Sequence, residues 1–181
     1  MMKEFQVYDL DSAPEGSRPL LQKSIKAFGS IPNLHGVMAE SPQALAAYQD
    51  LHQLFIDSAF NAEEMTVVWQ TINVEHNCHY CVPAHSAIAK AMKVDDAINE
   101  ALRNKTPLPT EKLEVLRETT LAIVRERGVV SDEVLERFYG AGYNRQNMLD
   151  IIVGVAQKVM SNYINHLADT PVDAQFASFV R

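Results

Sequence analysis

The chain has 181 residues, the length of one ordinary domain, and its 47% hydrophobic and 22% charged residues are typical of a globular protein. Lys and Arg number 16 against 23 Asp and Glu, a net charge of -7, which argues against a dedicated nucleic-acid binder and against an anionic membrane surface as partner. No stretch approaches the roughly 20 apolar residues of a membrane-spanning helix. The first residues lack the apolar core of a signal peptide, so we expect a cytoplasmic protein.

Helix start signals recur along the chain and predict a single all-α domain over residues 1–181. Ser41 followed by Pro42 predicts a helix over 42–57, and Asn61 with Glu64 predicts the start of a buried central helix. An extended arm over 1–16 holds the one candidate strand, 5–8, which has no partner. Residues 104–110 contain two prolines and predict a linker between two helical halves. The remaining helices are expected at 82–92, 95–102, 110–127, 131–140 and 144–168.

The last predicted helix carries an apolar stripe at helical spacing. This stripe runs from Met148 and Ile151 through Val159 to Leu167. Each half of the chain contains one long apolar helix with shorter neighbours, which suggests an internal helical repeat. Helical bundles of this kind commonly bury further apolar surface by self-association. We therefore expect a homo-oligomer with helix 144–168 in its interface.

The two cysteines, Cys78 and Cys81, lie three residues apart and are followed by His85. A secreted disulfide scaffold would use more cysteines and spread them along the chain, so this pair indicates redox or metal chemistry. In one continuous helix, Cys81 and His85 would lie one turn apart, with Cys78 and Glu75 on adjoining turns. Such a cluster holds the groups of an activated thiol: a nucleophile, a second thiol, an imidazole and a carboxylate.

Pro83 modifies this geometry, because proline is tolerated only in the first turn of a helix. It predicts a break near His76 and Asn77 and a new helix that begins at the cysteines. The thiols would then lie at the positive end of that helix, which favours the thiolate. A break also moves Glu75 away from the thiols.

Two other interpretations of the cysteine segment stay open. Cys78, Cys81 and His85 with His76, His79 or His166 have a spacing that zinc sites use, and the two thiols could instead be inert core residues. Asn162 and His166 could face the cysteines from another helix, although a hydrogen-bonded core pair is the simpler explanation. His35 and His52 have no acidic or thiol neighbour at a useful spacing, so we expect surface or structural roles for them.

The segment Glu75-x-x-Cys78-x-x-Cys81-x-x-x-His85, set in an all-helical chain, resembles the alkylhydroperoxidase D-like and carboxymuconolactone decarboxylase-like superfamily. The similarity extends from about residue 17 to residue 175 and is greatest with an uncharacterised peroxidase-related branch. It implies an all-α bundle of the alkylhydroperoxidase D-like type that assembles into oligomers. True carboxymuconolactone decarboxylases generally lack the cysteine pair, so the decarboxylase activity is not carried over.

The resemblance implies a role for each residue of the motif. Cys81 would attack the peroxide, Cys78 would resolve the product as a disulfide, and His85 would act as base, with Glu75 as a proton relay. In the best-known members the relay glutamate lies on the preceding helix, at the position that Thr66 occupies here. Glu64 and Glu75 flank that position, and either could replace it.

The leading hypothesis is an antioxidant enzyme that reduces small organic hydroperoxides through a Cys78–Cys81 disulfide cycle. It implies a dithiol reductant as partner and no metal or organic cofactor, because sulfur carries the electrons. The alternatives are a zinc-holding structural or binding protein, and a non-redox enzyme that acts on a small acid or lactone with His85 as base.

Overall fold

The computed structural model describes residues 5–181, and within them the regular structure is entirely helical. The all-α prediction is confirmed. Of the expected arm over 1–16, residues 1–4 lie outside the described residues. The elements in chain order are η1 (Glu15–Ser17), α1 (Arg18–Phe28), α2 (Asn33–Met38), α3 (Pro42–Ile56), α4 (Ala62–Glu75), α5 (Cys81–Ala91), α6 (Asp96–Asn104), α7 (Glu111–Arg125), α8 (Asp132–Gly140), α9 (Arg145–Ala168) and η2 (Ala174–Phe179).

Local capping sets the helix starts that the sequence predicts. The side chain of Ser41 accepts from the Ala44 N–H at the start of α3, and Asn61 forms a capping box with Glu64 at the start of α4. Asn144 forms a second capping box at the start of α9. These bonds satisfy backbone donors that the first helical turn leaves unpaired, so a few adjacent residues determine each start.

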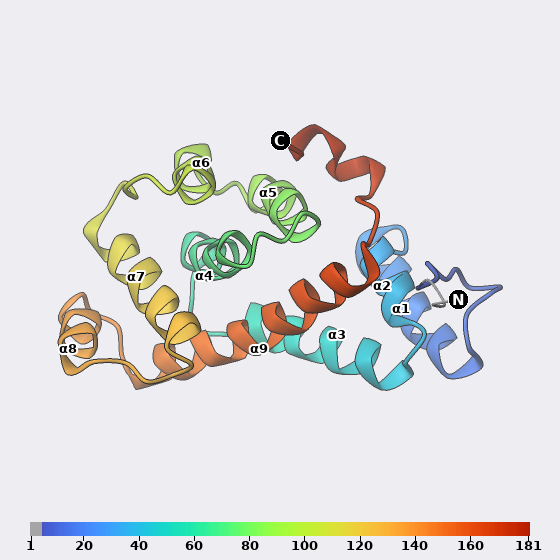
Figure 1. The fold of residues 1–181 in the computed structure, drawn as a ribbon, viewed down its shortest axis with the longest axis horizontal. Helices are drawn as coiled ribbons and strands as arrows, with labels where there is room; N and C mark the ends of the chain where they lie inside the picture. The colour runs from blue at the N-terminus through green and yellow to red at the C-terminus, as the bar shows by residue number, and fades with distance from the viewer. Residues whose placement is uncertain (1–4) are drawn as a thin grey trace.

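Helix α9 lies along the long axis of the molecule and runs from the side of α7 and α8 to α2 (Figure 1). It packs against α3 and α4, and the buried α4 also packs against α5, α6 and α7. Val67, Val68 and Trp69 of α4 are at most 1% exposed, which confirms the predicted central helix. No helix in the described part of the chain is long and apolar enough to cross a membrane.

The structure adds three points about the N-terminal region and α9. Residues 5–8 form no strand, and one hydrogen bond joins the Tyr8 N–H to the Gly36 carbonyl at 3.1 Å, because a lone strand has no ladder to complete. Helices α1 and α2 were not predicted from the sequence. The apolar stripe of α9 is divided between core and surface: Ile151 is 0% exposed, whereas Ile152 is 45% exposed and Leu167 is 74% exposed.

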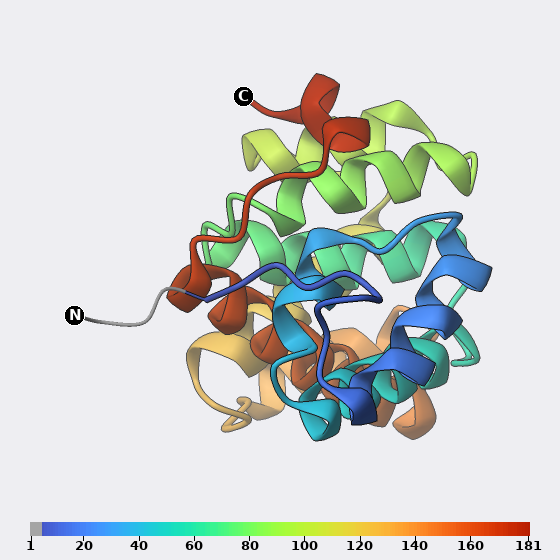
Figure 2. The same ribbon diagram turned by 90° about the vertical axis from the view of Figure 1, so that its right-hand side faces the viewer.

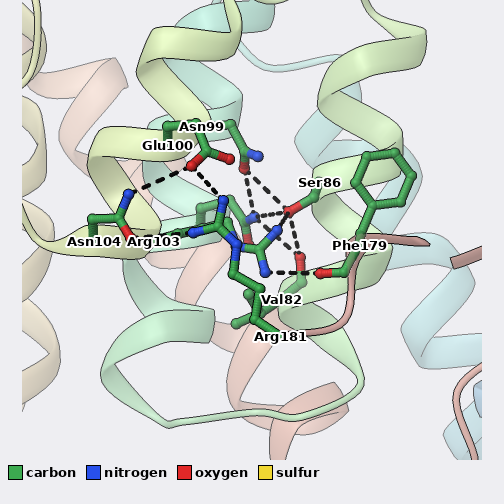
Figure 3. A network of polar contacts seen from close by, with 9 residues as sticks. Val82, Ser86, Asn99, Glu100, Arg103, Asn104, Phe179 and Arg181 are labelled. Atoms are coloured by element: carbon green, nitrogen blue, oxygen red, sulfur yellow. Dashed lines mark hydrogen bonds and ion pairs between the residues drawn. The ribbon is translucent and has the colours of Figure 1, made fainter. Parts of the chain in front are cut away.

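The C-terminal segment after α9 crosses back over α5 (Figure 2). Arg103 of α6 donates to the Phe179 carbonyl at 2.7 Å and to Ser86 Oγ at 3.3 Å (Figure 3). Arg181 pairs with Glu100 in the same network. These contacts fix the segment against α5 and α6, and it therefore provides one wall of the cavity described below.

Candidate active site

Both cysteines lie where α4 ends and α5 begins. Asn77 has a φ of +50°, a left-handed conformation that asparagine tolerates, and it turns the chain between the two helices. Cys81 is the first residue of α5 and Pro83 lies in its first turn, which confirms the helix break predicted from the proline. The Cys81 N–H donates to Cys78 Sγ at 3.2 Å. Both thiols are free and buried, and they lie at the positive end of the helix.

The polar face of α9 closes over the two thiols. Asn165 Nδ2 lies 3.2 Å from Cys81 Sγ and 3.9 Å from Cys78 Sγ, so one amide group reaches both sulfur atoms. Ser161 Oγ lies 3.8 Å from Cys81 Sγ. Both side chains are completely buried. A buried amide directed at sulfur is a donor suited to a thiolate, because each hydrogen bond donated to the sulfur favours the charged form.

Lys158 of α9 is the residue at the thiols that sequence reasoning missed. Its side chain is fully buried, and its Nζ lies 2.8 Å from Nε2 of His85. The only signal in the sequence is its spacing: Lys158, Ser161 and Asn165 recur at three and four residues along one helix face. The apolar stripe of the same helix is the stronger pattern in the sequence, and it does not include these three residues.

His85 is held next to Lys158 and Trp69, with its ring centroid 4.8 Å from that of the tryptophan. In the described part of the chain no hydrogen bond joins His85 to Cys81, although the two are one helical turn apart. Burial lowers the pKa of His85 well below its ordinary value, and the charge of Lys158 lowers it further. The imidazole is therefore neutral at physiological pH.

The two thiols differ in acidity. Burial alone would raise the pKa of Cys81, but hydrogen bonding to Cys78, the charge of Lys158 and hydrogen bonding to Ser161 together lower the pKa below the ordinary value for a cysteine. The pKa of Cys78 is raised, first by its hydrogen bond with Cys81 and then by burial. Cys81 is thus the thiol that ionises and Cys78 the one that keeps its proton.

A cavity of about 310 Å³ opens beside Cys81. No aspartate or glutamate is among its lining residues in the described chain, and Lys158 is its one lysine or arginine. Most of the surface is aromatic or aliphatic. The lining residues are Phe28, Pro32, Leu34, His35, Tyr48, His52, Tyr80, Cys81, Ala84, His85, Ala87, Ile88, Ala91, Lys158, Gln175 and Phe176. A small organic molecule without a positive charge suits such a cavity.

The structure brings His35 and His52 to the cavity wall, where the sequence analysis had expected surface or structural roles. Burial lowers the pKa of His35 to about 3, and it lowers the pKa of His52 to about 4 with a smaller effect of Lys158. Hydrogen bonds require the same neutral state of His52: Trp69 Nε1 donates to Gln157 Oε1 at 2.8 Å, so the Gln157 amide donates to His52 Nδ1 at 3.0 Å. Nδ1 must therefore be unprotonated.

Neither candidate relay glutamate contacts the thiols. Glu75 accepts from Arg125 of α7 at 2.7 and 2.8 Å, and Glu64 pairs with Lys112 at 3.1 Å in addition to its capping role. Thr66, at the family position of the relay, donates to the carbonyl of Ala62 within its own helix. The structure therefore brings together Cys81, Cys78 and His85 of the predicted site and leaves Glu75 outside it.

The predicted zinc ligands are not gathered around a common point. Within residues 5–181 no group of three or more His, Cys, Asp or Glu side chains is placed to hold a metal ion. His76 is hydrogen-bonded to Asn162 at 3.0 Å, His79 is bonded to the Thr170 carbonyl at 2.9 Å, and His166 is exposed. Asn162 is buried in a hydrogen-bonded network, as the simpler expectation had it, but its partner is His76 and not His166.

Comparison with solved structures identifies the fold. The chain is similar to an alkylhydroperoxidase AhpD-core, uncharacterised peroxidase-related protein from Ralstonia eutropha, with a TM-score of 0.82, 18% identity and coverage of 96% of this chain and 95% of that one. An uncharacterised peroxidase-related protein from a Silicibacter species matches with a TM-score of 0.79 and 19% identity, over 96% of this chain and 95% of that one. The debrominase Bmp8, in a Cys-to-Ala form complexed with 2,3,4-tribromopyrrole, matches with a TM-score of 0.81 and 16% identity, over 99% of this chain and 96% of that one. No family model and no curated protein matches the sequence.

Proposed function

We propose that this chain, which has the alkylhydroperoxidase D-like fold, is a thiol-dependent enzyme that reduces small organic hydroperoxides. One observation carries the proposal: two free thiols of opposite acidity lie together, and the more acidic one, Cys81, lines an apolar cavity. A thiolate beside an organic-sized cavity is the arrangement that peroxide reduction by sulfur requires.

The chemistry proceeds in three balanced steps. The Cys81 thiolate attacks the terminal oxygen of the hydroperoxide, the O–O bond breaks, and the products are Cys81 sulfenic acid and, after protonation, an alcohol. The Cys78 thiol then attacks the sulfenic sulfur, which releases water and forms the Cys78–Cys81 disulfide. An external dithiol reduces this disulfide by exchange and is itself oxidised to a disulfide. We place the reaction in the cytoplasm, where thiols are kept reduced.

The position of Cys78 supports its role as the resolving thiol. Cys78 is absent from the lining of the cavity that Cys81 faces, so the hydroperoxide meets Cys81 first. The Asn165 amide reaches both sulfur atoms, so the second thiol lies next to the first. His85 contributes through its contact with Lys158, because no hydrogen bond within residues 5–181 links it to Cys81.

The experiment follows consumption of cumene hydroperoxide with dithiothreitol as reductant. The matched pair is Cys81→Ser and Cys78→Ser, two buried thiols three residues apart that are exchanged for the same side chain. We expect Cys81→Ser to abolish turnover. Without dithiothreitol, Cys78→Ser should consume one equivalent of hydroperoxide and leave a sulfenic acid that dimedone traps. Unchanged turnover in Cys81→Ser would disprove the proposal.

The aromatic lining of the cavity favours a second candidate, the reductive removal of halogen from a small aromatic ring. Phe28, Tyr48, Tyr80 and Phe176 can pack against a flat ring. The two thiols would supply two electrons: the carbon–bromine bond is replaced by carbon–hydrogen, and bromide, a proton and the disulfide are the other products. Release of bromide from tribromopyrrole, with no loss of cumene hydroperoxide, would favour this candidate. Activity that survives removal of both thiols would instead indicate the non-redox alternative.

A further inference from the structure

Lys158 is a buried amine that no carboxylate neutralises. It is 0% exposed, and no ion pair to an Asp or Glu is found for it in the described part of the chain. Lysine is rarely buried without a partner, because removal of an ammonium from water is costly. A methionine or leucine would fill the same space in a helix core, so the charge itself requires an explanation.

The titratable groups that face Lys158 come from three elements. His85 of α5 is its hydrogen-bond partner, and Cys78 and Cys81 come from the α4–α5 junction and α5. His52 and Tyr48 of α3 line the same cavity as Lys158. Burial raises the pKa of Tyr48, and the pKa values of His52 and His85 are lowered, so these three are neutral at physiological pH. The pKa of Cys78 is raised, so it keeps its proton, and the thiol of Cys81 is the one remaining group among these that can balance the ammonium.

A charged Lys158 can only donate, so His85 is the acceptor in their contact. A neutral imidazole that accepts at Nε2 carries its proton at Nδ1, so His85 accepts a hydrogen bond from the ammonium and takes no proton from the thiol. The imidazole thus anchors one of the three ammonium hydrogens. This arrangement differs from the direct thiol–imidazole pair that the four-residue spacing predicts.

We infer that Lys158, held by His85, is the positioning residue that keeps Cys81 as a thiolate, in place of a glutamate relay. The inference rests on the proposed function for the identity of the reacting sulfur. The Cys81 thiol gives its proton to the Lys158 amine, which yields a thiolate and an ammonium. When the O–O bond breaks, the same proton passes from the ammonium to the departing alkoxide, so the lysine is again neutral and the proton balance closes.

The test measures the ionisation of Cys81 directly, so it does not depend on any peroxide substrate. Thiolate ultraviolet absorbance is titrated against pH, with Cys81→Ser as the blank, and the rate of alkylation by iodoacetamide is measured over the same range. The variants are Lys158→Met and Lys158→Gln, which remove the charge, and Lys158→Arg, which keeps it. Lys112→Met is the matched control, because Lys112 is an exposed lysine that pairs with Glu64.

We expect the wild-type thiolate to form below the ordinary cysteine pKa of about 8.5. Lys158→Met and Lys158→Gln should move the midpoint above that of the wild type and slow alkylation at neutral pH at least about tenfold, the effect of a shift of one pKa unit. The midpoint of Lys158→Arg should lie between those of the wild type and Lys158→Met. Lys112→Met should change neither the midpoint nor the alkylation rate.

Two results would overturn the inference. One is a thiolate midpoint of the wild-type protein at or above the ordinary cysteine pKa, a measurement that does not depend on the folding of any variant. The other is a midpoint that stays unchanged in a folded Lys158→Met or Lys158→Gln protein, as judged by circular dichroism. If hydroperoxide is not consumed but the midpoint shifts as expected, the proposed substrate is wrong while the role of Lys158 stands.

Discussion

Lowering the pH from 7 to 5 should destabilise this protein through the histidines of its cavity. His35 and His52 have folded-state pKa values of about 3 and about 4, against an ordinary value of 6.5, because burial disfavours their charged forms. In the unfolded chain both become protonated as the pH falls through 6.5. In the folded chain both stay neutral until about pH 4. The unfolded state therefore binds more protons across this window, and stability falls as the pH falls.

The magnitude follows from proton linkage. At pH 5 an unfolded histidine is almost fully protonated and the folded one is almost fully neutral, so each site destabilises the protein by about 2 kcal/mol relative to pH 7. The two sites together give about 4 kcal/mol, a large part of the stability of a typical domain. Where a histidine binds one more proton in the unfolded chain than in the folded chain, the free energy of unfolding changes by about 1.4 kcal/mol per pH unit.

The assay is urea unfolding at pH 7, 6 and 5, followed by the fluorescence of Trp69, the one tryptophan of the chain. His52→Gln should reduce the pH dependence by about one proton, since glutamine does not titrate. His166→Gln is the matched control, because His166 is exposed. A wild-type stability that is constant from pH 7 to pH 5, or an equal effect of both substitutions, would refute the reasoning.

Three further predictions concern other parts of the chain. Glu75→Gln removes the ion pair with Arg125 and should leave hydroperoxide turnover unchanged while costing less than about 1 kcal/mol in urea unfolding; a large loss of turnover would restore Glu75 as the relay. In Gly154→Ala the new Cβ would lie 2.8 Å from Phe55 Cε2. Overpacking of about 1–3 kcal/mol should exceed the helix-propensity gain of about 1 kcal/mol and lower the urea midpoint, and a raised midpoint would contradict this. Leu149, 68% exposed on the outer face of α9, should lie in the expected homo-oligomer interface, so Leu149→Glu should lower the mass measured by light scattering; an unchanged oligomeric mass would exclude that face.

The helix boundaries could be predicted because their causes are local. Thr110, Ser131 and Asn144 each accept a backbone N–H from the first turn of the helix that follows them, and the sequence places each of them next to that turn. Pro83 likewise determines where α5 can begin. The family resemblance, made on a segment of eleven residues, is confirmed at the level of the fold.

The orientation of α9 could not be predicted in this way. Its sequence offers an apolar face and a polar face, and a hydrophobic pattern favours burial of the apolar one. The structure buries the face with Lys158, Ser161 and Asn165 and leaves Leu149 and Leu167 exposed. The pattern of one helix does not show that another element places thiols against its polar side chains. It also does not show that some of its apolar side chains remain exposed.

The sequence by itself therefore determined the helical class, most helix starts and the thiol pair at the beginning of a helix, because each depends on residues within a few positions of one another. Only the tertiary structure decided which groups surround that pair. It brings Lys158 to His85 from 73 residues away and places His35 and His52 on the cavity wall, while Glu75 turns to Arg125. The physical reason is that the charge and acidity of a buried group depend on its neighbours in space, and long-range packing selects those neighbours.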